Sequence, residues 1–231
     1  MNHEALLHRL GAEIKLCLLD PTDSGHPANV KPECRLCLCW LCLRLRWRRT
    51  VNLGMLGAIF KKAPHTPPHL FVPNALYMLT ASTYRSEPFM QTTERKLNWI
   101  KTFLTSAEMY KWEVVAWVVL DNHYHAVLKA PDSADNLPKF VASYHRFTAR
   151  NWNEEEQASG RKVWWNYWDT CIRSEYDYYN RLRYTFWNPV MHGLVKDPND
   201  YPFSSYKVFL SKWKVKFNFT NMEEVKNVPE F

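Results

Sequence analysis

A continuous apolar run in the middle of the chain, Val114 to Leu120, constrains the fold more than any other segment. It is rich in valine and too short for a typical helix, so it predicts a buried β-strand. Asp121-Asn122 then supplies a turn, and residues 124–129 predict a strand that runs back beside the first. His123 and His125 stand where this second strand begins. Residues i and i+2 of a strand face the same side, so we expect the two imidazoles side by side.

Regular patterns on both sides of this hairpin predict an alternation of strands and helices. The expected order is strand, helix, strand, strand, helix, strand, helix, at residues 76–84, 92–110, 114–120, 124–129, 137–152, 163–173 and 174–188. The last helix is expected to end near Asn188, because Pro189 disfavours helical geometry in the residue before it. This order is typical of a ferredoxin-like (RRM-like) α+β fold, an antiparallel sheet with helices on one face, here followed by a C-terminal helix. The open face of such sheets often binds nucleic acid.

The first 65 residues differ in character from the rest of the chain. Four of the six cysteines lie between Cys34 and Cys42, in two C-x-x-C pairs that would suggest zinc. Only Leu38 separates the pairs, which is too little chain for a comfortable four-cysteine site, so we favour an extension without metal. We expect residues 1–65 to be poorly ordered or adventitious, for example translated leader sequence ahead of a later start such as Met55. Residues 66–210 are expected to form the functional domain, and residues 211–231 a basic tail.

Charge and composition narrow the class of partner. A formal net charge of +7 at pH 7 suggests an anionic partner, with nucleic acid first and acidic lipid second. The 11 Trp, 12 Tyr and 12 Phe include rings that could stack on unpaired bases, although most aromatic rings fill the core. No apolar run reaches the roughly 18 residues that a membrane span needs. The N-terminus lacks the layout of a signal peptide, so we expect a cytoplasmic protein with no membrane partner.

The histidine pair is a candidate metal site. Neutral imidazole suits Mg, Mn, Zn or Fe sites, depending on the other ligands. His123 and His125 alone are too few and need a third ligand from elsewhere. The alternative is a pair of exposed strand histidines, which the apolar flanks disfavour because so apolar a strand is central.

Tyr184 and Asn188 stand at the i, i+4 spacing that puts two side chains on one helix face. A phenol beside a divalent cation can lose its proton below its ordinary pKa of about 10 and attack phosphorus as phenolate. The asparagine carbonyl oxygen is a hard ligand that suits Mg or Mn. Composition alone does not exclude the nearby Tyr176, Tyr178 and Tyr179 as nucleophile, although Tyr178 and Tyr179 point away from the face of Tyr184.

These residues carry a resemblance to a known family. Asn122-His123-Tyr124-His125, after a valine-rich strand, resembles the His-hydrophobe-His motif of single-tyrosine HUH transposases. Residues 183–195 resemble their tyrosine helix and the Asn-Pro-Val…Gly-Leu-Val stretch that follows it, and residues 200–206 resemble the next short segment. The likeness spans roughly residues 66–210 and is closest to the REP-associated tyrosine transposases. Tyr124 departs from the smaller or purely apolar residue usual at its position, and its side chain is expected to face away from the metal.

The resemblance implies a metal-dependent single-strand DNA endonuclease and strand transferase that acts on single-stranded or hairpin DNA, as a monomer or homodimer. Tyr184 would be the nucleophile and would leave a 5′-phosphotyrosine link and a free 3′-hydroxyl. His123, His125 and Asn188 would hold Mg²⁺ or Mn²⁺.

Weaker predictions concern the binding of DNA. Phosphates could be bound by Arg85, Lys139, Arg146 and Arg150, and extruded bases could stack on Trp164, Trp165 or Trp168. Two other functions stay open. The chain could be a nucleic-acid-binding module that does not cleave, or a hydrolase that uses the histidine pair to activate water.

Overall fold

The computed structural model describes residues 59–61 and 69–213. The cysteine cluster and most of the basic tail lie outside these ranges, so the expectations for them stay untested. Ile59–Lys61 forms strand β1, which pairs antiparallel with strand β2 (His69–Phe71). No helix in the described part of the chain is long and apolar enough to cross a bilayer.

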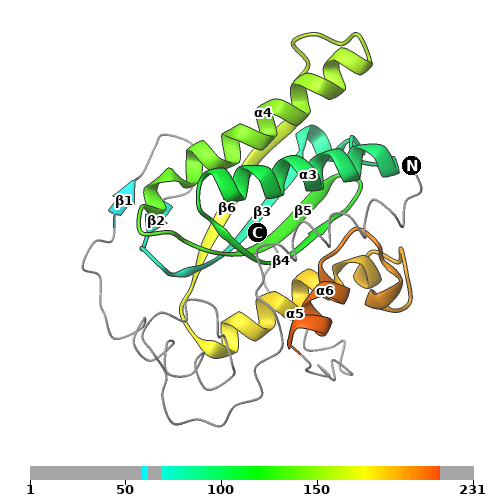
Figure 1. Ribbon diagram of the computed structural model, residues 1–231. Coiled ribbons are helices and arrows are strands. Elements are labelled where there is room, and N and C mark those ends of the chain that lie inside the picture. Colours follow the sequence, from blue (N-terminus) through cyan, green and yellow to red (C-terminus); the bar gives the residue numbers. More distant parts are fainter. Residues whose placement is uncertain (1–58, 62–68, 214–231) are drawn as a thin grey trace, which may run out of the picture. The chain divides into compact units, whose positions relative to one another are not determined.

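The centre of the structure is a four-stranded antiparallel sheet (Figure 1). Its strand order is β4-β5-β3-β6. The strands are β3 (Leu76–Thr83), β4 (Glu113–Val119), β5 (His123–Lys129) and β6 (Trp164–Ile172), and the helices are α3 (Thr93–Met109), α4 (Leu137–Glu155), α5 (Glu175–Met191) and α6 (Tyr206–Trp213). The order along the chain is the predicted one, and the ferredoxin-like α+β fold is confirmed.

One face of the sheet carries the main hydrophobic core. Alternate side chains of β3 and β5, among them Leu79 and Tyr124, point to this face and are fully buried. Helices α3 and α4 cover it side by side (Figure 1). Trp99 of α3 packs against Tyr124 of β5 and against Tyr144 of α4. These contacts join the two helices to the strand that carries the histidines.

The other face of the sheet meets α5 (Figure 1). The Thr185 hydroxyl lies 3.8 Å from the sulfur of Met78, and the ring of Tyr184 packs edge-on against His125. The side expected to be open is therefore partly covered by the C-terminal helix. Because strand side chains alternate, His123 and His125 lie on this second face, opposite α3 and α4.

Helix α5 begins where the sequence predicts and ends later. The Ser174 hydroxyl caps its first turn by accepting from the Asp177 backbone N–H at 3.0 Å. The expected end near Asn188 is wrong, because the helix continues through Pro189 to Met191. The stop is made by Gly193 with a φ of +69°, where Gly193 N–H donates to Val190 O and Leu194 N–H donates to Pro189 O, both at 2.9 Å. This pair of bonds is the Schellman termination, and it places the end of the helix at the glycine rather than the proline.

The segment after α5 covers the outer edge of the sheet. Short 3₁₀ turn η3 (Pro198–Asp200) leads into residues 201–205, which lie along β4. Val119 N–H donates to Phe203 O at 3.0 Å, and Ser205 N–H donates to Trp117 O at 2.9 Å. The β4 edge is thereby hydrogen-bonded, and α6 extends past residue 210 into the segment expected to be a tail.

Candidate active site

Four side chains from two distant segments meet between β5 and α5. The rings of His123 and His125 lie 5.1 Å apart, centroid to centroid. Nε2 of His123 is 3.2 Å from Oδ1 of Asn188, and the ring of His125 is 4.9 Å from the ring of Tyr184. Asn188 is fully buried and Tyr184 is 7% exposed. The structure therefore brings together the four residues that the sequence singles out.

Hydrogen bonds behind the imidazoles fix their orientation. Nδ1 of His125 lies 2.9 Å from the Thr80 hydroxyl, and Nδ1 of His123 lies 2.7 Å from Oδ1 of Asn122. An amide oxygen only accepts, so the Nδ1–H of His123 donates to Asn122 and its Nε2 presents a lone pair. That lone pair faces the amide oxygen of Asn188, a second acceptor. An unprotonated Nε2 and an amide oxygen cannot hydrogen-bond to each other, whereas both could ligate one cation.

A second observation agrees with this arrangement. Nε2 of His125 is buried and has no hydrogen-bond partner among the described residues, and the same is true of Nδ2 of Asn188. Buried polar atoms are normally paired, so an unpaired imidazole nitrogen points to an absent partner. The donor set of two imidazoles and an amide oxygen fits Mg²⁺ or Mn²⁺ with open positions. No trio of His, Cys, Asp and Glu is gathered closely enough in the described residues to hold a metal ion without the amide.

Burial also keeps both imidazoles neutral. Desolvation, followed by repulsion from His192, lowers the pKa of His123 to about 4. Desolvation and repulsion from His123 lower the pKa of His125 well below its ordinary value. The neutral form is the one that ligates metal, so the pair needs no deprotonation at neutral pH.

The other tyrosines of α5 lie elsewhere. Tyr176 is exposed to solvent. Tyr178 is buried against Tyr179, and its pKa is raised by burial and by the charge of Glu113, a residue at the far end of β4 from the histidine pair. Tyr184 is thus the tyrosine of this helix that packs on His125.

Comparisons with known proteins identify relatives of this chain. No protein-family model matches the chain. Over 110 residues the chain is 32% identical to a protein of Haemophilus influenzae named REP-associated tyrosine transposase, a match covering 44% of this chain and 62% of the relative. Over 101 residues it is 35% identical to the REP-associated tyrosine transposase of Escherichia coli, covering 41% of this chain and 54% of the relative. The chain resembles REP-associated tyrosine transposases.

The fold of this chain is also similar to that of a solved structure. It is a REP-associated tyrosine transposase bound to a REP hairpin, with a TM-score of 0.52 and 22% identity, and the match covers 65% of this chain and 87% of that one. The chain spans 62% and 54% of the two curated transposases. The two sequence matches therefore confirm the resemblance to REP-associated tyrosine transposases, and the solved structure confirms the fold.

Two residues of the site were missed in the sequence. His192 caps the C-terminus of α5, and its ring lies 4.9 Å from that of His123. Its signal was available, since Tyr184, Asn188 and His192 recur every four residues on one helix face. Thr80 had no such signal, because its place beside His125 depends on the pairing of β3 with β5.

The weaker DNA-binding predictions scatter over the molecule. Lys139, Arg146 and Arg150 are exposed on α4, the helix that covers the face opposite the histidines. Arg150 is also paired with Glu154 at 2.7 Å. The structure does not bring these three residues to the site, and their binding of DNA stays a prediction.

The remaining candidates lie nearer the histidines. Arg85 lies in the 3₁₀ turn η1 (Tyr84–Ser86), directly after β3. Trp164 is buried and stacks on His145 at 4.2 Å, so it presents no open ring to a base. Trp168 is half-buried on β6 and pairs with Thr80, and Trp165 is exposed near the start of the same strand.

Proposed function

We propose that this chain is a metal-dependent single-strand DNA endonuclease and strand transferase that acts on hairpin-forming DNA through Tyr184. The observation that supports this most is the meeting of Tyr184, Asn188 and the histidine pair in one cluster, in which all but His123 are buried. The resemblance to REP-associated tyrosine transposases, one of them solved with a REP hairpin, supports hairpin-forming DNA as the class of substrate.

His123, His125 and Asn188 would hold Mg²⁺ or Mn²⁺. The cation would polarise a non-bridging phosphate oxygen and neutralise charge that develops at phosphorus. Thr80 and Asn122 would orient the two imidazoles, because their contacts with both Nδ1 atoms leave the Nε2 atoms available as ligands.

Tyr184 would carry the covalent step. Its phenolic oxygen attacks the scissile phosphorus, a new Oη–P bond forms, and the bond from phosphorus to the 3′-oxygen breaks. The phenolic proton passes to solvent, and the departing 3′-oxygen takes up a proton to become a free hydroxyl. One phosphodiester is exchanged for another, so the step needs no nucleotide triphosphate, and attack by a different 3′-hydroxyl reverses it to join strands.

The test is formation of a covalent complex. The full chain is mixed with labelled hairpin DNA carrying single-stranded flanks, with Mn²⁺, and analysed on a denaturing gel. We expect an adduct in the wild type and in Tyr176→Phe, a control tyrosine that is 78% exposed on the same helix, and none in Tyr184→Phe.

Two other outcomes would each replace the proposal. Cleavage that gives free 5′-phosphate ends and persists in Tyr184→Phe indicates a hydrolase that activates water. Binding of the hairpin with no adduct under any divalent cation indicates a module that binds without cleaving.

A further inference from the structure

Two aromatic rings and two cations gather at one end of the sheet, outside the proposed catalytic cluster. The rings of Tyr84 and Trp165 lie 5.5 Å apart and are tilted by 38°. Nζ of Lys162 lies 3.9 Å from the centre of the Trp165 ring and 4.9 Å from that of Tyr84, while the Arg85 guanidinium lies 5.2 Å from the Tyr84 ring. Trp165 is 44% exposed. We call Tyr84, Arg85, Lys162 and Trp165 the aromatic platform.

The aromatic platform is tied to the strand end that carries the histidines. Tyr84 follows Thr83, whose N–H donates to Asn122 O at 2.8 Å, and the Asn122 side-chain amide donates to Ser86 O at 3.1 Å. Asn122 directly precedes His123 and contacts its ring. Tyr84 N–H also donates to Val163 O at 2.7 Å, which fixes the two halves of the platform to each other. A DNA strand bound at the proposed catalytic cluster would therefore have the aromatic platform beside it.

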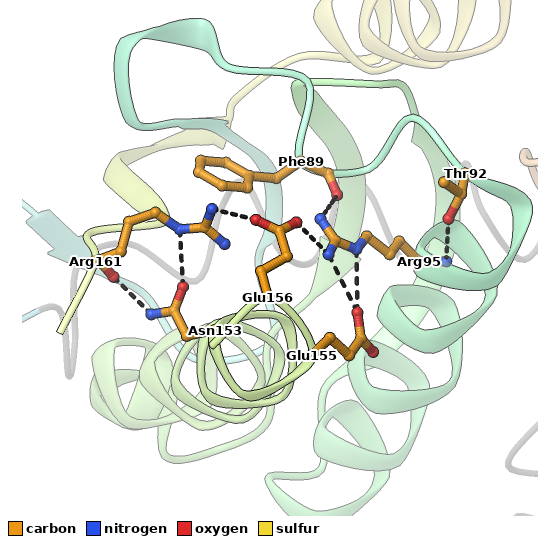
Figure 2. A network of polar contacts seen from close by, with 7 residues as sticks. All are labelled: Phe89, Thr92, Arg95, Asn153, Glu155, Glu156 and Arg161. Carbon is orange, nitrogen blue, oxygen red and sulfur yellow. Dashed lines mark hydrogen bonds and ion pairs between the residues drawn. The ribbon is translucent and has the colours of Figure 1, made fainter. Parts of the chain in front are cut away.

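A polar network holds the segment before Lys162 in place (Figure 2). Arg161 donates from Nε to Oδ1 of Asn153 at 3.0 Å, receives the Asn153 amide on its carbonyl oxygen at 2.7 Å, and pairs with Glu156. Its guanidinium also lies 4.5 Å from the Phe89 ring. Arg95 pairs with Glu155 and Glu156 and donates to Phe89 O at 3.2 Å. Both loops that carry the platform are thus anchored to the end of α4.

This network also decides which cations are available. Glu155 and Glu156 are engaged by Arg95 and Arg161, as Figure 2 shows. In contrast, Lys162 and Arg85 form no ion pair with any carboxylate in the described part of the chain, and their contacts are with ring faces. Rings with unpaired cations on them are what recognition of single-stranded nucleic acid uses, with bases on the rings and phosphates on the cations.

We infer that the aromatic platform is a stacking site for one unpaired base of the single-stranded DNA that flanks the hairpin. The base takes the face of Trp165 now covered by Lys162, and Lys162 moves onto the adjoining phosphate. Bases inside a duplex already stack on each other and offer no free face, so the site selects single strand over duplex. The inference rests on the proposed function, whose substrate it completes.

The experiment measures binding of labelled DNA by fluorescence anisotropy in the Tyr184→Phe background, so that cleavage does not interfere. Two probes are compared, a blunt hairpin and the same hairpin with a single-stranded flank. Stacking on one base is worth about 1–3 kcal/mol, so Trp165→Ala should weaken binding of the flanked probe by a factor of about 5 to 150 and leave the blunt probe unchanged. Trp165→Phe, which keeps a ring, should retain most of the affinity.

Three further arms make the result specific. Phe147→Ala is the matched control, because Phe147 is a comparably exposed ring (52%) on α4, and both probes should bind it as before. Lys162→Gln should lower the slope of log affinity against log salt by about one for the flanked probe. An abasic site at one flank position should reproduce the loss in the parent protein and add nothing in Trp165→Ala.

Equal loss on both probes, or no loss on either, overturns the inference. These outcomes are independent of the adduct assay. If the adduct persists in Tyr184→Phe while Trp165→Ala selectively weakens the flanked probe, the assigned nucleophile fails and the base site stands. If the adduct is lost in Tyr184→Phe while the two probes respond alike to Trp165→Ala, the nucleophile stands and the base site fails.

Discussion

Nε2 of His123 lies 3.2 Å from Oδ1 of Asn188, although the two residues are 65 positions apart in the chain. His123 begins β5, and Asn188 lies in the last turn of α5. With Nδ1 of His123 donating to Asn122, the facing atoms are both acceptors. We therefore propose the cation site at this contact, and substitutions on either side of it test the proposal.

Asn188→Ala should weaken Mn²⁺ binding by more than about tenfold, because it would remove the one oxygen among the three protein donors proposed to hold the ion. Asn188→Asp should keep the affinity, since a carboxylate oxygen is also a hard ligand. Isothermal titration calorimetry without DNA measures both, with circular dichroism to check that the buried substitution leaves the fold intact. Unchanged affinity in a folded Asn188→Ala protein would remove Asn188 from the ligand set.

Thr80→Val should weaken Mn²⁺ binding by about 10- to 100-fold, although it replaces none of the proposed ligands. The substitution removes the hydroxyl that lies 2.9 Å from Nδ1 of His125, so the ring loses its fixed orientation and tautomer. Thr80→Ser keeps the hydroxyl and should bind as the wild type does. A Val variant that binds Mn²⁺ normally would show that Thr80 does not orient His125.

Tyr124→Phe should lower the stability of the protein without changing its Mn²⁺ affinity, although Tyr124 stands between the two histidines. Its hydroxyl lies 2.6 Å from that of Tyr144 and 2.9 Å from Nε2 of His145, on the sheet face away from α5. Loss of these buried bonds should lower the free energy of unfolding by about 1–3 kcal/mol. Urea denaturation measures this, and Mn²⁺ affinity should not change. A fall in Mn²⁺ affinity would mean that the two faces of β5 are coupled.

The stability of the protein should fall below pH 6.5, in part through His145. Burial lowers the pKa of His145 from 6.5 to about 3. Between these values the unfolded chain binds a proton that the folded chain does not, so stability is full above pH 6.5 and decreases as pH falls towards 3. One such group contributes at most about 1.4 kcal/mol per pH unit.

Urea denaturation at pH 7 and pH 5 measures how much of the loss of stability at low pH is due to His145. His145→Gln should be less stable than the wild type at pH 7, because the contact with Tyr124 changes. Its stability should nevertheless fall less between pH 7 and pH 5, by about 1–2 kcal/mol. An unaltered slope in His145→Gln would assign the acid sensitivity to other groups.

Much of the fold was readable from local patterns, and particular residues show why. The valine-rich run predicted β4 because a buried strand needs apolar side chains on both faces, and Ser174 predicted the start of α5 because a hydroxyl satisfies free N–H groups there. The end of α5 was misjudged from Pro189. The chain stops instead where Gly193 adopts positive φ, and the buried Pro189 is accommodated within the final turn.

The sequence by itself determined the alternation of strands and helices, the shared strand face of His123 and His125, and the shared helix face of Tyr184 and Asn188, because these follow from periods of two and 3.6 residues. Only the tertiary structure decided that α5 lies on the face of the sheet that carries the imidazoles, that Thr80 lies behind His125, and that Trp165 is exposed while Trp164 is buried. These relationships depend on which strands pair and which face each helix covers. Long-range packing decides the strand pairing and the face that each helix covers, and neither can be predicted from a local pattern in the sequence.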